Sequence, residues 1–127
     1  MQDTIGIDIS KDTLDIHRQS DGRHARFGND KAGLAALRRW IGKTPVRVVY
    51  EATGRYHRDM EAALDAAGHA LVKVNPGRTR RFAQAAGYGA KTDRVDAAML
   101  VRMGVVLELE ATPVRSESMH EIRELHI

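Results

Sequence analysis

The stretch "TIGIDISKDTLDIHRQSDGRHARFGN", residues 4–29, decides the fold that we expect for this chain. At its start, isoleucines alternate with glycine, aspartate and serine, and this period of two is typical of a β-strand. Two further segments flank Asp21 and Gly22, a pair that is a strong signal for a β-hairpin. The chain therefore predicts an antiparallel meander. Its three strands are expected at residues 4–10, 13–19 and 23–29.

The segments that follow alternate between helix and strand. A first helix is expected to start after Asn29 or Asp30 and to end at Gly42, because these residues are common helix caps. Asn75 and Pro76 open a short basic helix for a similar reason. The other elements are expected at 45–52 (strand), 55–68 (helix), 69–74 (strand) and 92–107 (helix). This order predicts an α/β fold, a mixed sheet with helices on both faces, by analogy with the ribonuclease H-like fold.

Composition limits the classes of protein that this chain can represent. Its 127 residues, 43% hydrophobic and 29% charged, suit one soluble globular domain. No apolar run approaches the roughly 20 residues that span a bilayer, and no secretory signal is visible. Cysteine is absent, which excludes disulfides and thiolate chemistry. We therefore expect a cytoplasmic protein without membrane contact, and the net charge of +3 permits a nucleic-acid partner.

Four acidic residues stand out because the expected fold gathers them. Asp8 lies near the end of the first strand, on the face opposite the isoleucines, and Glu51 ends the fourth strand. Asp93 and Asp96 are three apart in "AKTDRVDAAML" (90–100), which places both on the otherwise apolar face of the expected helix. If the first and fourth strands are parallel neighbours, the four carboxylates converge at one edge of the sheet.

Converging carboxylates repel one another in a poorly solvated pocket, and bound cations remove that repulsion. Carboxylate oxygens are hard ligands that suit Mg²⁺ or Mn²⁺. Two such ions about 3.5–4 Å apart are the usual means of stabilising the attacking and leaving oxygens in phosphodiester displacement. The sequence therefore predicts a catalytic metal site formed by Asp8, Glu51, Asp93 and Asp96.

Each of these acids also has a simpler interpretation. Asp93 is explained equally well as a first-turn acid favoured by the helix dipole. Asp8 is explained as a buried acid with its own partner, and Glu51 as the cap of the following helix. Asp96 resists such an explanation, since it falls one turn inside the expected helix on its apolar side. The other acids are interpreted as surface groups: Asp12, Asp15, Asp59, Glu61 and Asp65.

Four stretches occur in one order between residues 4 and about 107: "IGIDISKDTLDI", "YEATGRYHRDMEAALDAAGH", "VNPGRTRRFAQAAG" and "AKTDRVDAAMLVRMG". Together they resemble the amino-terminal domain of DEDD transposases of the insertion-sequence one-ten family, whose relatives include pilin-gene invertases. The resemblance implies a RuvC-like domain whose Asp-Glu-Asp-Asp tetrad maps onto the four acids already named. It also implies a role in DNA transposition by recombination.

The same resemblance implies partners and a further domain. Members of the family move DNA, and at least some are guided by a structured RNA from their own element. They also have a carboxy-terminal domain with a nucleophilic serine, and neither Ser116 nor Ser118 lies in a matching motif. We therefore expect a RuvC-like DEDD domain at 1–107 and the start of a linker or helix at 108–127. We expect no activity from this fragment alone.

Basic residues beside the expected acidic site suit contacts with nucleic-acid phosphates, which give affinity without reading sequence. Three arginines crowd one short helix, two basic residues flank the paired aspartates in sequence, and one arginine follows the fourth strand. These candidates are Arg55, Arg78, Arg80, Arg81, Lys91 and Arg94. For the three on the helix, the alternative is a solvated helix face. His57 is interpreted as a surface residue, and no histidine spacing indicates zinc.

The helix at 92–107 also predicts an interface. Its inward stripe is expected to end at Leu107, and further apolar residues lie outside this stripe: Met99, Val101, Val105 and Val106. We expect them to contact a second subunit, giving a dimer, or the further domain. Other functions stay open: a stand-alone metal-dependent nuclease or Holliday-junction resolvase, an RNA-binding domain with vestigial acids, and an actin-like phosphate-binding module, whose second glycine-rich loop has no match here.

Overall fold

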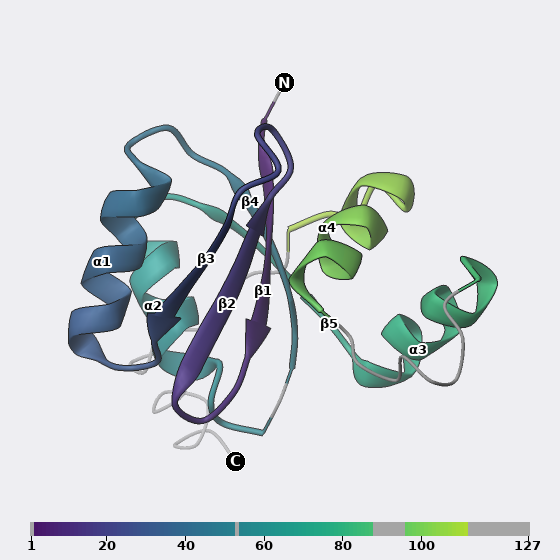
Figure 1. Ribbon diagram of the computed structural model, residues 1–127, viewed down its shortest axis with the longest axis horizontal. Helices are drawn as coiled ribbons and strands as arrows, with labels where there is room; N and C mark the ends of the chain where they lie inside the picture. Colours follow the sequence, from purple (N-terminus) through teal and green to yellow (C-terminus); the bar gives the residue numbers. More distant parts are fainter. Residues whose placement is uncertain (1, 53, 88–95, 112–127) are drawn as a thin grey trace, which may run out of the picture.

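The computed structural model describes residues 2–52, 54–87 and 96–111, which form a five-stranded sheet covered by helices (Figure 1). The strands are β1 (Thr4–Ile9), β2 (Thr13–Arg18), β3 (His24–Gly28), β4 (Arg47–Glu51) and β5 (Ala70–Val74). Their order across the sheet is β3-β2-β1-β4-β5. The β1–β2 and β2–β3 pairs are antiparallel, whereas β1–β4 and β4–β5 are parallel. The expected meander and the parallel pairing of the first and fourth strands are confirmed.

Helices cover both faces of this sheet. They are α1 (Lys31–Ile41), α2 (Arg58–Ala66), α3 (Pro76–Ala85) and α4 (Ala97–Val106). Helices α1 and α2 lie on one face, and α3 and α4 lie on the other (Figure 1). This arrangement and the strand order are those of the ribonuclease H-like fold, so the expected fold class is confirmed. Within the described ranges, none of the helices has the length and hydropathy needed to span a bilayer.

The helix starts follow from local capping. The Asp30 carboxylate accepts a hydrogen bond of 2.7 Å from the backbone N–H of Gly33 at the start of α1. The Asn75 side chain accepts one of 2.8 Å from the backbone N–H of Arg78 at the start of α3, and Pro76 occupies the first helical position. Both caps satisfy an N–H that has no partner within its own helix. The expected start of the basic helix is confirmed.

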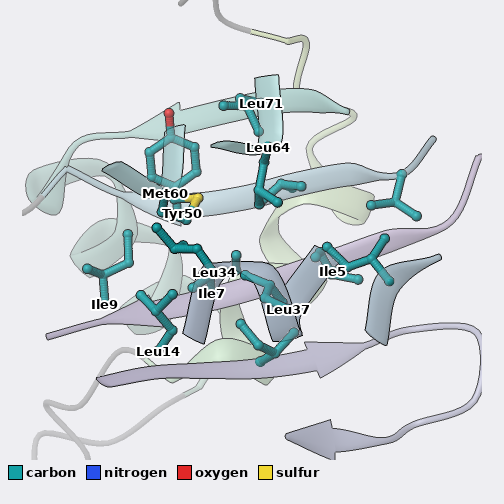
Figure 2. Packing of buried hydrophobic residues seen from close by; sticks show 14 residues of the cluster. Ile5, Ile7, Ile9, Leu14, Leu34, Leu37, Tyr50, Met60, Leu64 and Leu71 are labelled. Atoms are coloured by element: carbon teal, nitrogen blue, oxygen red, sulfur yellow. The ribbon is translucent and has the colours of Figure 1, made fainter. Parts of the chain in front are cut away.

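The larger core lies between the sheet and helices α1 and α2 (Figure 2). Ile5 and Ile7 of β1 are fully buried there, in one cluster with Leu37 of α1 and with Met60 and Leu64 of α2. Because side chains alternate along a strand, the isoleucines occupy this face and leave the intervening residues for the other face. The alternation in β1 therefore separates a packing face from the face that holds Asp8.

The opposite face has a smaller core formed mainly by β4, β5 and α4. Its buried members are Val49, Val72, Val74, Leu100, Met103 and Leu109. Two glycines allow α4 to lie directly on the strands. A Cβ atom on Gly6 would lie 2.1 Å from the carbonyl oxygen of Ala97, and one on Gly104 would lie 2.5 Å from Cγ2 of Val49. Helix α4 is therefore seated directly on β1 and β4.

The helix expected at 92–107 differs in its start and in its buried face. Helix α4 begins at Ala97. Met99 and Val101, expected outside the inward stripe, are buried, whereas Leu107, expected inside it, is 41% exposed. The middle of the predicted stripe is buried as expected, and its limits were wrong because α4 is covered on more than one side by the sheet and its neighbours, a situation that a single apolar stripe does not describe. Val105 and Val106 are exposed, as expected.

Two residues interpreted as surface groups are buried instead. Glu61 of α2 accepts a hydrogen bond from the Tyr50 hydroxyl, and its Oε2 lies 3.1 Å from Nζ of Lys73. His57 is 7% exposed, and its Nε2 lies 3.8 Å from Oε1 of Glu61. Burial, together with this carboxylate, raises the pKa of the Tyr50 hydroxyl. The surface interpretation failed because partners on β4 and β5 compensate the cost of burying the Glu61 charge.

The other acids interpreted as surface groups remain at least partly accessible. Asp12, Asp59 and Asp65 are exposed, and Asp15 is half-buried. At the end of the described chain, Leu109 packs two residues beyond the expected domain limit. That limit, and the linker expected at 108–127, stay predictions because 112–127 lies outside the described residues.

Candidate metal and nucleic-acid site

Asp8 and Glu51 lie at the ends of two neighbouring parallel strands. The register of β1 and β4 pairs Ile7 with Tyr50, so the next step along both strands brings Asp8 beside Glu51. Neighbouring strands are about 4.8 Å apart, and residues in register project to the same face. Both residues are half-buried on the face covered by α3 and α4. The fold therefore places two carboxylates side by side at one edge of the sheet.

A buried hydroxyl contacts one of these carboxylates. Thr79, on α3, is fully buried, and its Oγ1 lies 3.1 Å from Oε2 of Glu51. The sequence pattern did not single out Thr79, because arginines dominate the same helix. A signal was available: the cap at Asn75 fixes the helix phase, and that phase places Thr79 one turn in, on the same side as Phe82.

Asp8 has a charged neighbour on its other side as well. The β1–β2 register places Asp15 directly opposite Asp8, and the β2–β3 register places Arg26 opposite Asp15. Nε of Arg26 donates a 2.7 Å hydrogen bond to Asp15, and this carboxylate raises the pKa of the guanidinium. Since opposed residues share a face, a row of charged side chains crosses the sheet from Arg26 to Glu51.

Asp96 does not lie inside a helix, and this part of the sequence prediction was wrong. It is the N-cap of α4, with φ −103° and ψ 170°, and its Oδ1 accepts a 2.8 Å hydrogen bond from the backbone N–H of Met99. Its side chain is exposed. Aspartate is among the best N-cap residues, and its extended backbone marks the helix start at this position. The apolar stripe therefore begins at Ala97, after Asp96.

Two histidines of the meander lie on the same face as Asp8. His17 is paired with Gly6 on one side and with His24 on the other. Nδ1 of His17 lies 3.0 Å from Nε2 of His24. Burial and the neighbouring His24 lower the pKa of His17, although the charges of Asp96 and Asp21 act in the opposite direction. Asp96 acts on the pKa of His17 because α4 starts directly over Gly6, the residue paired with His17.

The structure thus brings some of the four predicted acids close together. Asp8 and Glu51 are neighbours, and Asp96 caps the helix whose first residue lies on β1. Asp93, Lys91 and Arg94 lie outside the described residues. Among residues 2–52, 54–87 and 96–111, no three acidic or histidine side chains are grouped closely enough to hold a metal ion. The four-carboxylate site stays a prediction.

The basic candidates in the described chain are accessible. Arg78, Arg80 and Arg81 are exposed on α3, and Arg55 is exposed before α2. Helix α3 also holds Thr79, so three exposed arginines lie on the helix that contacts Glu51. Exposed arginines on the helix that contacts Glu51 are available to bind the phosphates of a polyanion.

Comparison with known proteins shows the family of this chain. A model of DEDD transposases of the insertion-sequence one-ten family, described as "Transposase", matches residues 5–126. The chain belongs to this transposase family. The expected family membership is confirmed.

Two curated relatives extend well beyond this chain. Pilin gene-inverting proteins of Moraxella lacunata and Moraxella bovis are each 31% identical over 107 residues, which is 79% of this chain and 33% of the relative. The chain thus spans about one third of the length of these relatives. Among solved structures, the RuvC of Thermus thermophilus matches with a TM-score of 0.43 and 15% identity, over 93% of this chain and 86% of that one.

Proposed function

We propose that this chain is the metal-binding domain of a DNA transposase, with Asp8, Glu51, Asp93 and Asp96 as ligands of Mg²⁺ or Mn²⁺. The observation that supports the proposal most is the placement of Asp8 and Glu51 one step beyond the Ile7–Tyr50 pair, on the same face. The names of the curated relatives support recombination as the process, since those proteins invert a pilin gene.

The chemistry of the donors suits a hard divalent cation. Two carboxylates at neighbouring strand ends offer hard oxygen donors that one divalent cation can share. Thr79 holds one oxygen of Glu51, and the Asp96 carboxylate is already oriented by the N–H of Met99. When bound, the metal would stabilise the charge that develops on phosphate oxygens during strand cleavage. The protein's own contribution is to orient the carboxylate oxygens of Glu51 and Asp96 before the metal binds.

Nucleic-acid binding forms the second half of the proposal. We assign phosphate contacts to Arg55, Arg78, Arg80 and Arg81, which are exposed, and to Lys91 and Arg94, which flank the acids in sequence. DNA is the expected partner, with a structured guide RNA as a further one. The strand-exchange chemistry also needs the serine domain of the family, so residues 1–127 by themselves are expected to bind metal and nucleic acid without completing transposition.

A second copy of the chain is the partner that we propose for the end of α4. The apolar side chains exposed there are Val105, Val106 and Leu107, with Val106 60% exposed. Met99 and Val101, which the sequence assigned to this interface, are buried and cannot belong to it. The proposed contact is therefore limited to the last turn of the helix.

Thermal unfolding with and without metal tests the proposal. Adding Mn²⁺ or Mg²⁺ at about 100 times its Kd should stabilise the fold by roughly 2.7 kcal/mol, because the ion binds only the folded state. Asp8→Asn should abolish the shift. Asp59→Asn is the matched control, since Asp59 is an exposed acid of α2 on the other face of the sheet. If neither ion changes the melting temperature of the wild-type chain, the proposal is contradicted.

A further inference from the structure

The position of Thr79 is fixed by the way α3 begins. Asn75 caps the helix and Pro76 is its first residue, so Thr79 falls one turn in. The preceding strand, β5, pairs Val74 with Glu51, and the backbone N–H of Ala52 donates to the carbonyl of Val74. The chain therefore enters α3 directly beside the end of β4. This entry places the Thr79 side chain, fully buried, against Glu51.

The Thr79 hydroxyl has three acceptors within reach but only one proton. Oγ1 lies 3.1 Å from Oε2 of Glu51, 2.9 Å from the carbonyl oxygen of Pro76 and 3.3 Å from that of Asn75. The carbonyl oxygen of Pro76 is the nearest of these acceptors, and the Glu51 carboxylate is the strongest, because hydrogen bonds to a charged group are stronger than neutral ones. The two carbonyls can satisfy the buried hydroxyl whenever Glu51 is engaged elsewhere.

We propose that Thr79 is a positioning residue for the Glu51 carboxylate, and that this contact couples the arginine-bearing helix α3 to the cation site. The inference rests on the proposed metal-binding function. Arg78 and Arg80 flank Thr79 in sequence and are exposed, so the turn of α3 that would contact phosphates also orients Glu51. Removing a side chain that orients a metal ligand typically lowers the affinity for the metal by about 10- to 100-fold.

The test compares Thr79→Val with Thr79→Ser in the 127-residue chain. Valine has nearly the shape of threonine but no hydroxyl, whereas serine keeps the hydroxyl. The Mn²⁺ concentration that gives half of the maximal thermal shift should rise about 10- to 100-fold in Thr79→Val. It should stay near the wild-type value in Thr79→Ser. A purely structural role would lower the melting temperature of the metal-free protein without moving this midpoint.

A second measurement tests the contact without metal. The losses in melting temperature caused by Thr79→Val and by Glu51→Ala should not add, because residues in direct contact share one interaction. The double variant should lose less than the sum of the single variants. If Thr79→Val does not fold, Thr79→Ala serves in both experiments.

The outcomes separate this inference from the proposed function. Additive losses in melting temperature, together with an unchanged Mn²⁺ midpoint in Thr79→Val, would overturn the role of Thr79. The proposed function would still stand if Mn²⁺ raises the melting temperature of the wild-type chain and does not raise that of Asp8→Asn. A wild-type chain that does not respond to Mn²⁺ would overturn the proposed function, and the positioning role with it.

Discussion

On one face of the sheet, beneath α1 and α2, the buried residues form a large apolar cluster that includes Ile5, Ile7 and Leu37. On the other face, beneath α3 and α4, the apolar cluster is smaller, and Asp8 and Glu51 lie at its edge. The same strands supply both faces, because alternate residues of β1 and β4 point in opposite directions. The first face provides most of the stabilising burial, so the second can hold groups that stability alone would not favour.

The difference also extends to buried polar groups. Under α2, Glu61 has Tyr50 and Lys73 as close partners, and such a network is stable without any ligand. At the other face, Asp8 lies between Asp15 and Glu51, two groups of the same charge. Carboxylates that adjoin one another at strand ends are typical of a binding site, whereas an acid that contacts a hydroxyl and an ammonium is typical of a structural network.

The largest effect is expected from the packing face. Leu37→Ala should lower the free energy of unfolding by about 2–5 kcal/mol, because Leu37 is completely buried and its removal leaves a cavity. Urea unfolding at 25 °C measures this loss. The exposed neighbour Arg38 offers a control, and Arg38→Ala should change little. A loss as small as that of the control would mean that the larger cluster is not the main source of stability.

A smaller and more local effect is expected from the other face. Gly6→Ala should cost about 1–3 kcal/mol, because its Cβ would meet the backbone oxygen of Ala97 and α4 would have to shift. Hydrogen exchange should become faster in α4 and stay unchanged in α1. Gly77→Ala is the matched control, since a Cβ there meets nothing closer than 3.4 Å. Equal exchange rates in α4 of both variants would show that the helix is not seated on Gly6.

The smallest effect is a dependence of stability on pH. Burial lowers the pKa of His69 below its usual 6.5, and Nδ1 of its ring accepts a hydrogen bond of 3.1 Å from the backbone N–H of Val46. The unfolded chain therefore binds the proton more tightly than the folded chain. Stability should be complete above pH 6.5 and should fall as the pH drops from 6.5 towards the lowered pKa. The pKa of His17, which lies on the same face as Asp8, is lowered as well, so His17 contributes to stability in the same direction.

Urea unfolding between pH 8 and pH 5 measures this dependence. His69→Asn keeps an acceptor for Val46 and removes the titrating ring, so the decline below pH 6.5 should become shallower. The part that remains belongs partly to His17. If stability declines with the same slope in His69→Asn as in the wild-type chain, the pH dependence comes from His17 or from other groups, and not from His69.

Much of the fold was predictable because its signals are local. The alternation in β1, the turn at Asp21 and Gly22, and the caps at Asp30 and Asn75 each depend on a few neighbouring residues. These signals gave the element order, and the element order left few possible arrangements of the sheet. The pairing of Asp8 with Glu51 followed from that arrangement.

The errors arose where a residue's role depends on a partner far away in sequence. Glu61 and His57 look like surface residues of an amphipathic helix until Tyr50 and Lys73 are placed beside them. Asp96 looks like an inward-facing helical residue until the helix start is known. Thr79 gave only a weak sign of its contact with Glu51, because the arginines around it dominate the pattern.

The sequence by itself determined the strands, the helices and the two-sided pattern of β1, since these depend on backbone preference and on the period of side chains. Only the tertiary structure decided which acids have partners, where α4 rests, and that Thr79 contacts Glu51. The physical reason is that hydrogen bonds, charge interactions and close packing depend on distances between atoms, and the fold alone sets those distances for residues that are far apart in the chain.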